Sequence, residues 1–128
     1  MRGVLVLMVD DVASGGVQQW EFDGRSWTHV PVLTPPQRDM VQIVADQLHQ
    51  VIVLFGGLGK TDTWTWDGFT WTQRFPPQSP AVRSTTGPMP GMAYDAARGQ
   101  VVVFGGAGDG PVLNDTWLWD GAEWWQAA

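Results

Sequence analysis

The chain has 128 residues, of which 44% are hydrophobic and nine are tryptophan; this length and composition are typical of one globular domain or of part of a larger one. Its seven Lys and Arg against 13 Asp and Glu give a net charge of −6, which would repel a phosphate backbone and argues against a nucleic-acid partner. Because there is no cysteine, disulfides and thiol chemistry are excluded, and the compartment stays undetermined.

The first apolar segment, residues 4–8, follows Arg2 and has some likeness to a signal peptide. Asp10 and Asp11 end the apolar run before it reaches the usual length of a signal-peptide core, and no segment is long enough to cross a membrane. We therefore interpret residues 4–8 as a β-strand and expect no contact with a membrane.

An Asp-Gly-x-x-Trp unit occurs three times, with 44 residues from Asp23 to Asp67 and 53 residues from Asp67 to Asp120. Its members are Asp23, Gly24 and Trp27; Asp67, Gly68 and Trp71; and Asp120, Gly121 and Trp124. Self-similarity at this period is typical of propeller or solenoid architectures. Each Asp-Gly pair predicts a hairpin turn, because Asp can bond the backbone ahead of it and Gly tolerates a positive φ.

Helix signals are nearly absent, since 16 Gly and 9 Pro interrupt short segments that are β-branched and aromatic. The sequence predicts an all-β fold of eleven strands in three antiparallel sheets. The first sheet, within residues 1–30, has three strands because its opening, inner strand is missing. The second, within 38–74, has strands at 40–45, 51–55, 63–66 and 71–73, and the third, within 83–128, has strands at 91–94, 101–104, 116–119 and 124–126. Proline-rich connections cover residues 31–37 and 75–82.

The strand at residues 51–55 is apolar at every position, so both of its faces should be covered, as in a sheet stacked between two others. A Gly-Gly pair ends this strand and its counterpart, where it should permit a bend or a close backbone approach. These glycines are Gly56, Gly57, Gly105 and Gly106.

The next strand carries two tryptophans, two residues apart, that project from one face; Trp66 and Trp119 are the second of each pair. Trp71 and Trp124, beyond the hairpin turn, should return beside them. We expect at least seven of the nine tryptophans to be largely buried and to take the place of disulfides in stabilising the fold.

These residues resemble the kelch repeat, in which an apolar strand ends in Gly-Gly and is followed by an aromatic-Asp pair and then a Trp. The resemblance covers nearly the whole chain and is closest to bacterial kelch proteins; in the first unit Val9-Asp10 stands in place of Gly-Gly. It implies four-stranded blades of a β-propeller, the first blade lacking its inner strand.

Kelch propellers usually close with about six or seven blades, whereas this chain has just under three. An arc of this length exposes the apolar faces of its first and last blades, which repeat proteins cover with neighbours or caps. Two interpretations stay open: the chain is a fragment of a longer one, or copies of it assemble into a ring, with a dimer favoured.

Several catalytic and metal-binding functions are disfavoured. A copper radical oxidase needs a Cys and a second Tyr, and the chain has no Cys and only Tyr94. His29 and His49 have no partner at ligand spacing. A sialidase-like site would need an arginine cluster, and we expect Arg38 and Arg83 instead to bond backbone carbonyls between blades.

The remaining polar loops also fit no known site. Asp10, Asp11, Asp109, Asn114 and Asp115 do not have the spacing of a calcium loop. The glycine-rich residues 105–110 lack the Lys and the helix of a phosphate loop. We therefore expect no metal, no cofactor and no catalytic residue.

A binding surface remains. The resemblance places the loops between second and third strands (10–19, 58–61 and 107–113) and the two connections on one face, where a rigid scaffold presents recognition loops. The candidate binding residues are Asp10, Asp11, Lys60, Asp109, Arg38 and Arg83. The expected function is a non-catalytic module that binds a protein or another copy of itself, through these loops and the uncovered blade edges. The alternative is a carbohydrate-binding or glycan-processing propeller, which the abundance of tryptophan suggests.

Overall fold

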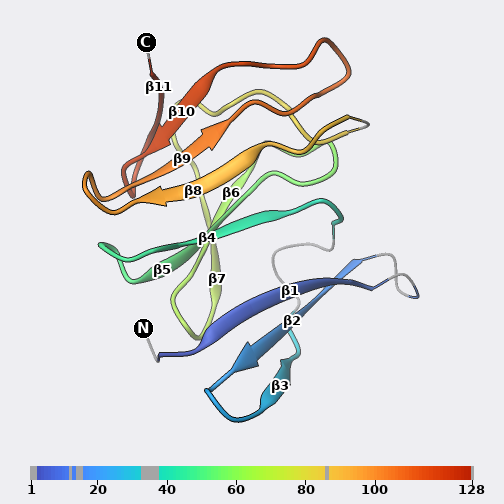
Figure 1. Cartoon of the computed structure of the whole chain (residues 1–128), viewed down its shortest axis with the longest axis vertical. Coiled ribbons are helices and arrows are strands. Elements are labelled where there is room, and N and C mark those ends of the chain that lie inside the picture. Colours follow the sequence, from blue (N-terminus) through green and yellow to red (C-terminus); the bar gives the residue numbers. More distant parts are fainter. Residues whose placement is uncertain (1–2, 12, 14–15, 33–37, 86, 128) are drawn as a thin grey trace.

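The computed structural model describes residues 3–11, 13, 16–32, 38–85 and 87–127. These residues form eleven strands and no helix (Figure 1). The strands build three antiparallel sheets in which every strand pairs with its neighbours in sequence. The predicted all-β fold with sheets of three, four and four strands is therefore confirmed.

The three sheets follow one another along the long axis of the molecule (Figure 1). The N-terminal sheet holds β1 (Leu5–Asp11), β2 (Gly16–Phe22) and β3 (Trp27–Val30). The middle sheet holds β4 (Gln42–Asp46), β5 (Val51–Phe55), β6 (Thr63–Trp66) and β7 (Trp71–Arg74). The C-terminal sheet holds β8 (Gly91–Asp95), β9 (Gln100–Phe104), β10 (Thr116–Trp119) and β11 (Trp124–Gln126).

Several strand ends differ from the prediction by one residue, and larger differences occur in two places. β4 begins at Gln42 rather than at Met40, because Met40 has a left-handed backbone (φ 57°) that does not fit a strand. The predicted loop at residues 10–19 is wrong: β1 continues to Asp11 and β2 starts at Gly16, with Asp10 opposite Val17. Val9-Asp10 stands where the other two sheets have a Gly-Gly pair, and the ladder continues through it.

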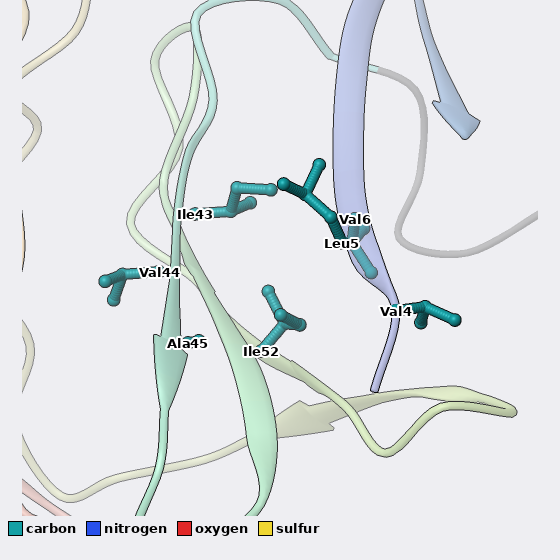
Figure 2. A pocket seen from close by; sticks show the side chains of 7 residues that line it. All are labelled: Val4, Leu5, Val6, Ile43, Val44, Ala45 and Ile52. Carbon is teal, nitrogen blue, oxygen red and sulfur yellow. The ribbon is translucent and has the colours of Figure 1, made fainter. Parts of the chain in front are cut away.

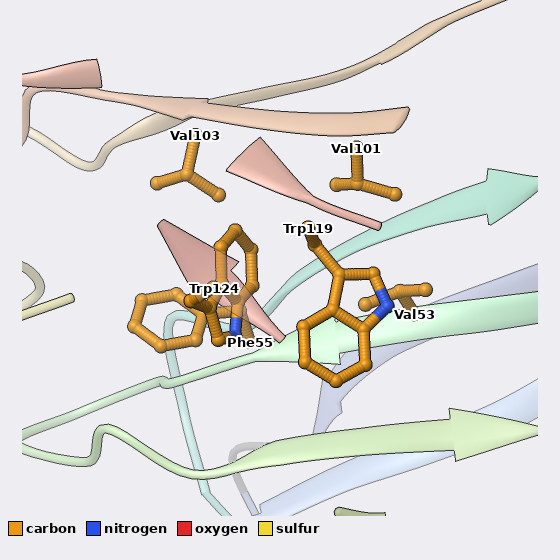
Figure 3. Packing of buried hydrophobic residues seen from close by; sticks show 6 residues of the cluster. All are labelled: Val53, Phe55, Val101, Val103, Trp119 and Trp124. Carbon is orange, nitrogen blue, oxygen red and sulfur yellow. The ribbon is translucent and has the colours of Figure 1, made fainter. Parts of the chain in front are cut away.

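The core consists of two clusters, one on each side of the middle sheet. Successive residues of a strand point to opposite faces, so Val53 and Phe55 of β5 pack toward the C-terminal sheet while Ile52 and Leu54 pack toward the N-terminal sheet. The first cluster joins them to Val101, Val103, Trp119 and Trp124 (Figure 3). The predicted covering of both faces of β5 is confirmed.

Tryptophan burial follows the position of the sheet. Five of the nine tryptophans are buried and two are partly buried, whereas Trp27 and Trp125 are each 46% exposed. The expected seven are therefore reached only when the partly buried rings of Trp20 and Trp117 are included. Both exposed rings belong to the outermost sheets.

Candidate functional site

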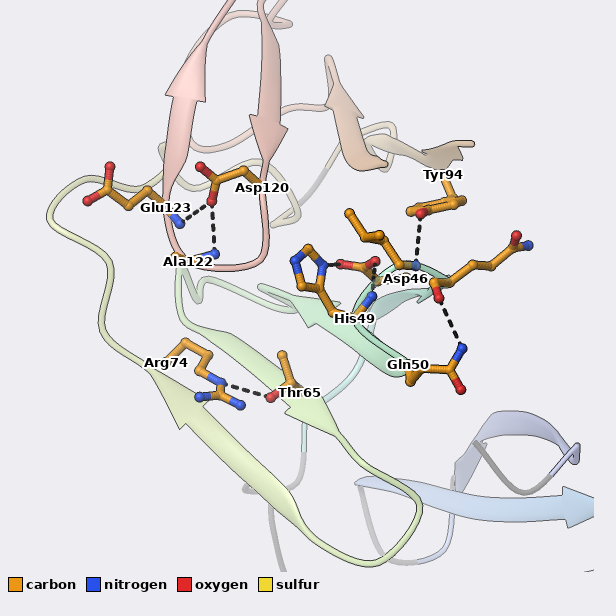
Figure 4. A network of polar contacts seen from close by, with 11 residues as sticks. Asp46, His49, Gln50, Thr65, Arg74, Tyr94, Asp120, Ala122 and Glu123 are labelled. Carbon is orange, nitrogen blue, oxygen red and sulfur yellow. Dashed lines mark hydrogen bonds and ion pairs between the residues drawn. The ribbon is translucent and has the colours of Figure 1, made fainter. Parts of the chain in front are cut away.

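The Asp-Gly turns have the predicted geometry. Asp67 Oδ1 accepts hydrogen bonds from the backbone N–H of Phe69 (2.8 Å) and Thr70 (2.9 Å), and Gly68 has a φ of 100°. Asp120 accepts in the same way from Ala122 and Glu123 (Figure 4), and Asp23 from Arg25 and Ser26. The N–H groups of Thr70 and Phe69 hold the pKa of Asp67 below its ordinary value. These aspartates are therefore engaged in turn structure.

Each turn brings a ring from the following strand back beside the preceding strand. Trp66 pairs with Trp71 and Trp119 with Trp124 across antiparallel strands, with ring centroids 5.6 and 5.4 Å apart. In the N-terminal sheet Trp27 lies 5.0 Å from Phe22 in the same register. The predicted return of the second ring is confirmed in all three sheets.

The Gly-Gly pairs make room for a buried arginine. A Cβ on Gly57 would stand 2.8 Å from Cδ of Arg38, and one on Gly106 would stand 2.5 Å from the carbonyl oxygen of Arg83. Both glycines have a positive φ (107° and 92°). The pairs thus provide the bend and the close approach that the sequence indicates.

Arg83 is 1% exposed and binds Asp115 through both terminal nitrogens, at 2.8 and 3.1 Å, while Nη1 also donates to the carbonyl of Gly105 (3.0 Å). Arg38, also buried, donates to the carbonyl of Gly56 (3.2 Å) and forms an ion pair with Asp62. The carbonyls predicted for these arginines are present. Gly56 directly follows β5 and Gly105 directly follows β9, so these two bonds act within the arginine's own repeat unit and differ from the predicted bonding between blades.

The arginine-bound carboxylates each hold a tryptophan as well. Asp115 Oδ2 accepts from Trp117 Nε1 and Asp62 Oδ2 from Trp64 Nε1, both at 2.7 Å. The hydrogen bond from Arg83 lowers the pKa of Asp115 to about 2, assisted by Trp117 and opposed by burial. For Asp62 burial raises the pKa, but the bonds from Arg38 and Trp64 together outweigh it and the net pKa is lowered.

The N-terminal sheet has an uncharged version of this arrangement. Trp20 Nε1 donates to Oε1 of Gln18 (3.2 Å), and Gln18 Nε2 donates to Asp11 (3.1 Å). Gln18 stands two residues before Trp20, as Asp62 and Asp115 stand before Trp64 and Trp117. The amide thus takes the tryptophan-binding position of the carboxylate in the other two sheets.

Neighbouring sheets are joined by hydrogen bonds from buried indoles. Trp71 Nε1 donates to Gln19 Oε1 of the N-terminal sheet (2.7 Å), and Trp124 Nε1 donates to Thr63 Oγ1 of the middle sheet (2.8 Å). Sequence reasoning missed these acceptors. The strand register could have identified them. Gln19 lies three residues before Phe22 and Thr63 three residues before Trp66, the aromatic residues that pair across the turn with Trp27 and Trp71.

The turn between β4 and β5, which contains His49, also contacts the C-terminal sheet (Figure 4). Asp46, fully buried, accepts from the backbone N–H of His49 (3.1 Å) and lies 2.7 Å from His49 Nδ1. The Tyr94 hydroxyl accepts from the backbone N–H of Leu48 (3.0 Å). A Cβ on Gly121 would stand 2.5 Å from the His49 ring. His49 therefore packs between the β4–β5 turn and the β10–β11 turn, where it has a structural role.

The two outermost sheet faces are apolar and uncovered. On the N-terminal sheet the exposed side chains are Leu5 (55%), Leu7 (42%), Val9 (41%) and Trp27. On the C-terminal sheet they are Phe104 (52%) and Trp125. Trp27 and Trp125, each 46% exposed, belong to opposite end sheets, so the two exposed tryptophan rings do not share one sheet face.

An apolar pocket of about 200 Å³ lies between β1 and the middle sheet (Figure 2). The residues that line it all have aliphatic side chains: Val4, Leu5, Val6, Ile43, Val44, Ala45 and Ile52. A specific small-molecule site usually adds a few polar groups that orient the ligand. No such side chain belongs to this lining.

Of the predicted recognition loops, the β5–β6 and β9–β10 loops lie on the same side of the molecule, the right of Figure 1, whereas most of the predicted connection at residues 31–37 lies outside the described residues. Lys60 and Asp109 are exposed there. Asp11 lies at the end of β1 and accepts hydrogen bonds, and Asp10 lies in β1 with a side chain outside the described set. Arg38 and Arg83 are buried, so their side chains are not presented at this surface.

Within the described part of the chain, no three His, Asp or Glu side chains gather as metal ligands would. The same residues include no apolar helix of membrane-spanning length. No protein-family model matches the chain, and none of the curated proteins matches it.

Proposed function

We propose that this chain is a kelch-type β-propeller segment without catalytic activity, and that it acts by associating with protein, in the first place with another copy of itself. The observation that carries the proposal is the pair of uncovered apolar faces on the two end sheets. Clusters of exposed apolar side chains of this kind mark association surfaces in soluble proteins.

The internal contacts support the proposal. Ile52 and Leu54 are buried because the N-terminal sheet covers them, and the matching residues Leu5 and Leu7 are exposed. Burial of apolar surface stabilises by about 25 cal/mol per Å², so covering Leu5, Leu7 and Trp27 provides a driving force for association. The loops that carry Lys60 and Asp109 offer a second, more polar surface for other partners.

Light scattering on the chain tests the proposal. We expect a discrete oligomer, with a dimer first, and we expect its mass to persist at high salt, because contact between apolar faces does not depend on charge and salt screens the repulsion between molecules of net charge −6. A monomer at all accessible concentrations and salt levels would contradict self-assembly.

A further inference from the structure

Both contacts between neighbouring sheets are built in one way. The sheet that comes later in the chain presents a face with tryptophans. An indole N–H from its last strand, after the turn, donates to a side-chain oxygen on the next-to-last strand of the preceding sheet. Trp71 donates to Gln19, and Trp124 donates to Thr63. The upstream sheet contributes apolar residues from one strand, Val53 and Phe55 in the contact with the C-terminal sheet.

Strand register identifies the counterparts of these residues on the two outer faces. Trp27 pairs with Phe22 as Trp71 pairs with Trp66, so Trp27 is the counterpart of the two donors. Thr116 pairs with Phe104 as Thr63 pairs with Phe55, so Thr116 is the counterpart of an acceptor. The end sheets therefore carry the two halves of the contact that joins sheets inside the molecule.

The apolar residues match in the same way. Leu5 and Leu7 occupy the positions of Ile52 and Leu54, which pack against the N-terminal sheet. Val102 and Phe104 occupy the positions of Val53 and Phe55, which pack against the C-terminal sheet. Each outer face is thus complementary to the other and not to itself.

We propose that the outer face of the N-terminal sheet packs on the outer face of the C-terminal sheet of a second copy, with Trp27 Nε1 donating to Thr116 Oγ1 of that copy. This inference rests on the proposed function, since it names the partner and the register of self-assembly. The contact is heterologous, because it joins two different faces. In a closed dimer it occurs twice, with the N-terminal face of each copy on the C-terminal face of the other.

Complementation between two blocked variants tests the orientation. Leu7→Asp places a charge on the first face and Phe104→Asp on the second, both at exposed positions that the fold tolerates. Each variant alone should be monomeric, because every head-to-tail contact includes one blocked face. An equimolar mixture should give a heterodimer, since one variant's intact C-terminal face meets the other's intact N-terminal face. Leu58→Asp, on an exposed loop, is the control and should keep the wild-type mass.

The outcomes separate the two proposals. A monomeric wild-type chain would contradict self-assembly itself. A wild-type oligomer together with either single variant that still associates, or a mixture that stays monomeric, would overturn only the head-to-tail pairing.

The hydrogen bond has its own test. Trp27→Phe keeps a ring but removes the donor, and Thr116→Val removes the acceptor with little change in shape. Because the closed pair makes this bond twice, each variant should weaken dimerisation about tenfold to a hundredfold, and the double variant should be no weaker than either single one. Independent, multiplying effects would show that Trp27 and Thr116 do not bond to each other.

Discussion

The N-terminal sheet and the middle sheet have the same turn and the same strand register, but only the middle sheet has a neighbouring sheet packed on its tryptophan-bearing face. The ring of Trp71 is 6% exposed beneath the N-terminal sheet, whereas the ring of Trp27, in the same register, is 46% exposed. The two residues have the same turn before them and an aromatic partner across the strand. Burial in this molecule is therefore decided by the neighbouring sheet and not by the sheet that carries the residue.

The comparison extends to charge. In the middle and C-terminal sheets, a buried arginine and an aspartate hold the loop after the second strand, with Arg83 and Asp115 the clearer example. In the N-terminal sheet the corresponding tryptophan is held by the uncharged Gln18. The same local shape is thus supported by an ion pair in one place and by an amide in another.

The largest expected effect contrasts two equivalent tryptophans. Trp124→Ala should lower the free energy of unfolding by about 3–5 kcal/mol, because the ring is fully buried between two sheets and leaves a cavity. Trp27→Ala should lower it by about 1 kcal/mol or less when measured at a dilution at which the chain is monomeric. Urea unfolding of both variants gives the two values. Equal losses would show that the N-terminal sheet buries its ring by itself.

A second prediction concerns acid. The pKa of Asp115 is lowered to about 2 in the fold, so its contribution to stability is present above the ordinary pKa near 4 and is lost as the pH falls toward 2. The contribution is at most about 2 kcal/mol, reduced by partial exposure. Between pH 5 and pH 2, Asp115→Asn should therefore lose less stability than the wild type in urea titrations. Parallel curves for the two proteins would contradict this role.

The smallest effect compares two glycines in equivalent turns. Gly24 and Gly121 have φ values of 99° and 100°, but a Cβ meets nothing within 4 Å at Gly24 and meets the His49 ring at Gly121. Alanine at either position incurs the same backbone strain. Gly121→Ala should lose about 1 kcal/mol more, because the partly exposed imidazole has to move. Thermal unfolding of the two variants, with His49→Ala added to the second, isolates that difference.

Much of the fold could be predicted because its signals are local. The Asp-Gly turns, the alternation of β5 and the return of Trp71 beside Trp66 depend on residues within one hairpin. The ion pairs of Arg38 and Arg83 and the two indole hydrogen bonds between sheets join residues between 24 and 61 positions apart, and no periodicity specifies which side chains meet over such distances. The exposure of Trp27 was also beyond local reasoning, since the motif is the same whether or not a sheet covers it.

The neighbour-to-neighbour pairing of every strand has a consequence for the order in which the molecule forms. Within each sheet the paired strands are consecutive in the chain, so their pairing costs less chain entropy than the pairing of strands far apart in the sequence would. We therefore expect the three sheets to nucleate independently of one another. We expect the docking of preformed sheets to be the slow event, because the indoles of Trp71 and Trp124 must then leave water and bond to Gln19 and Thr63.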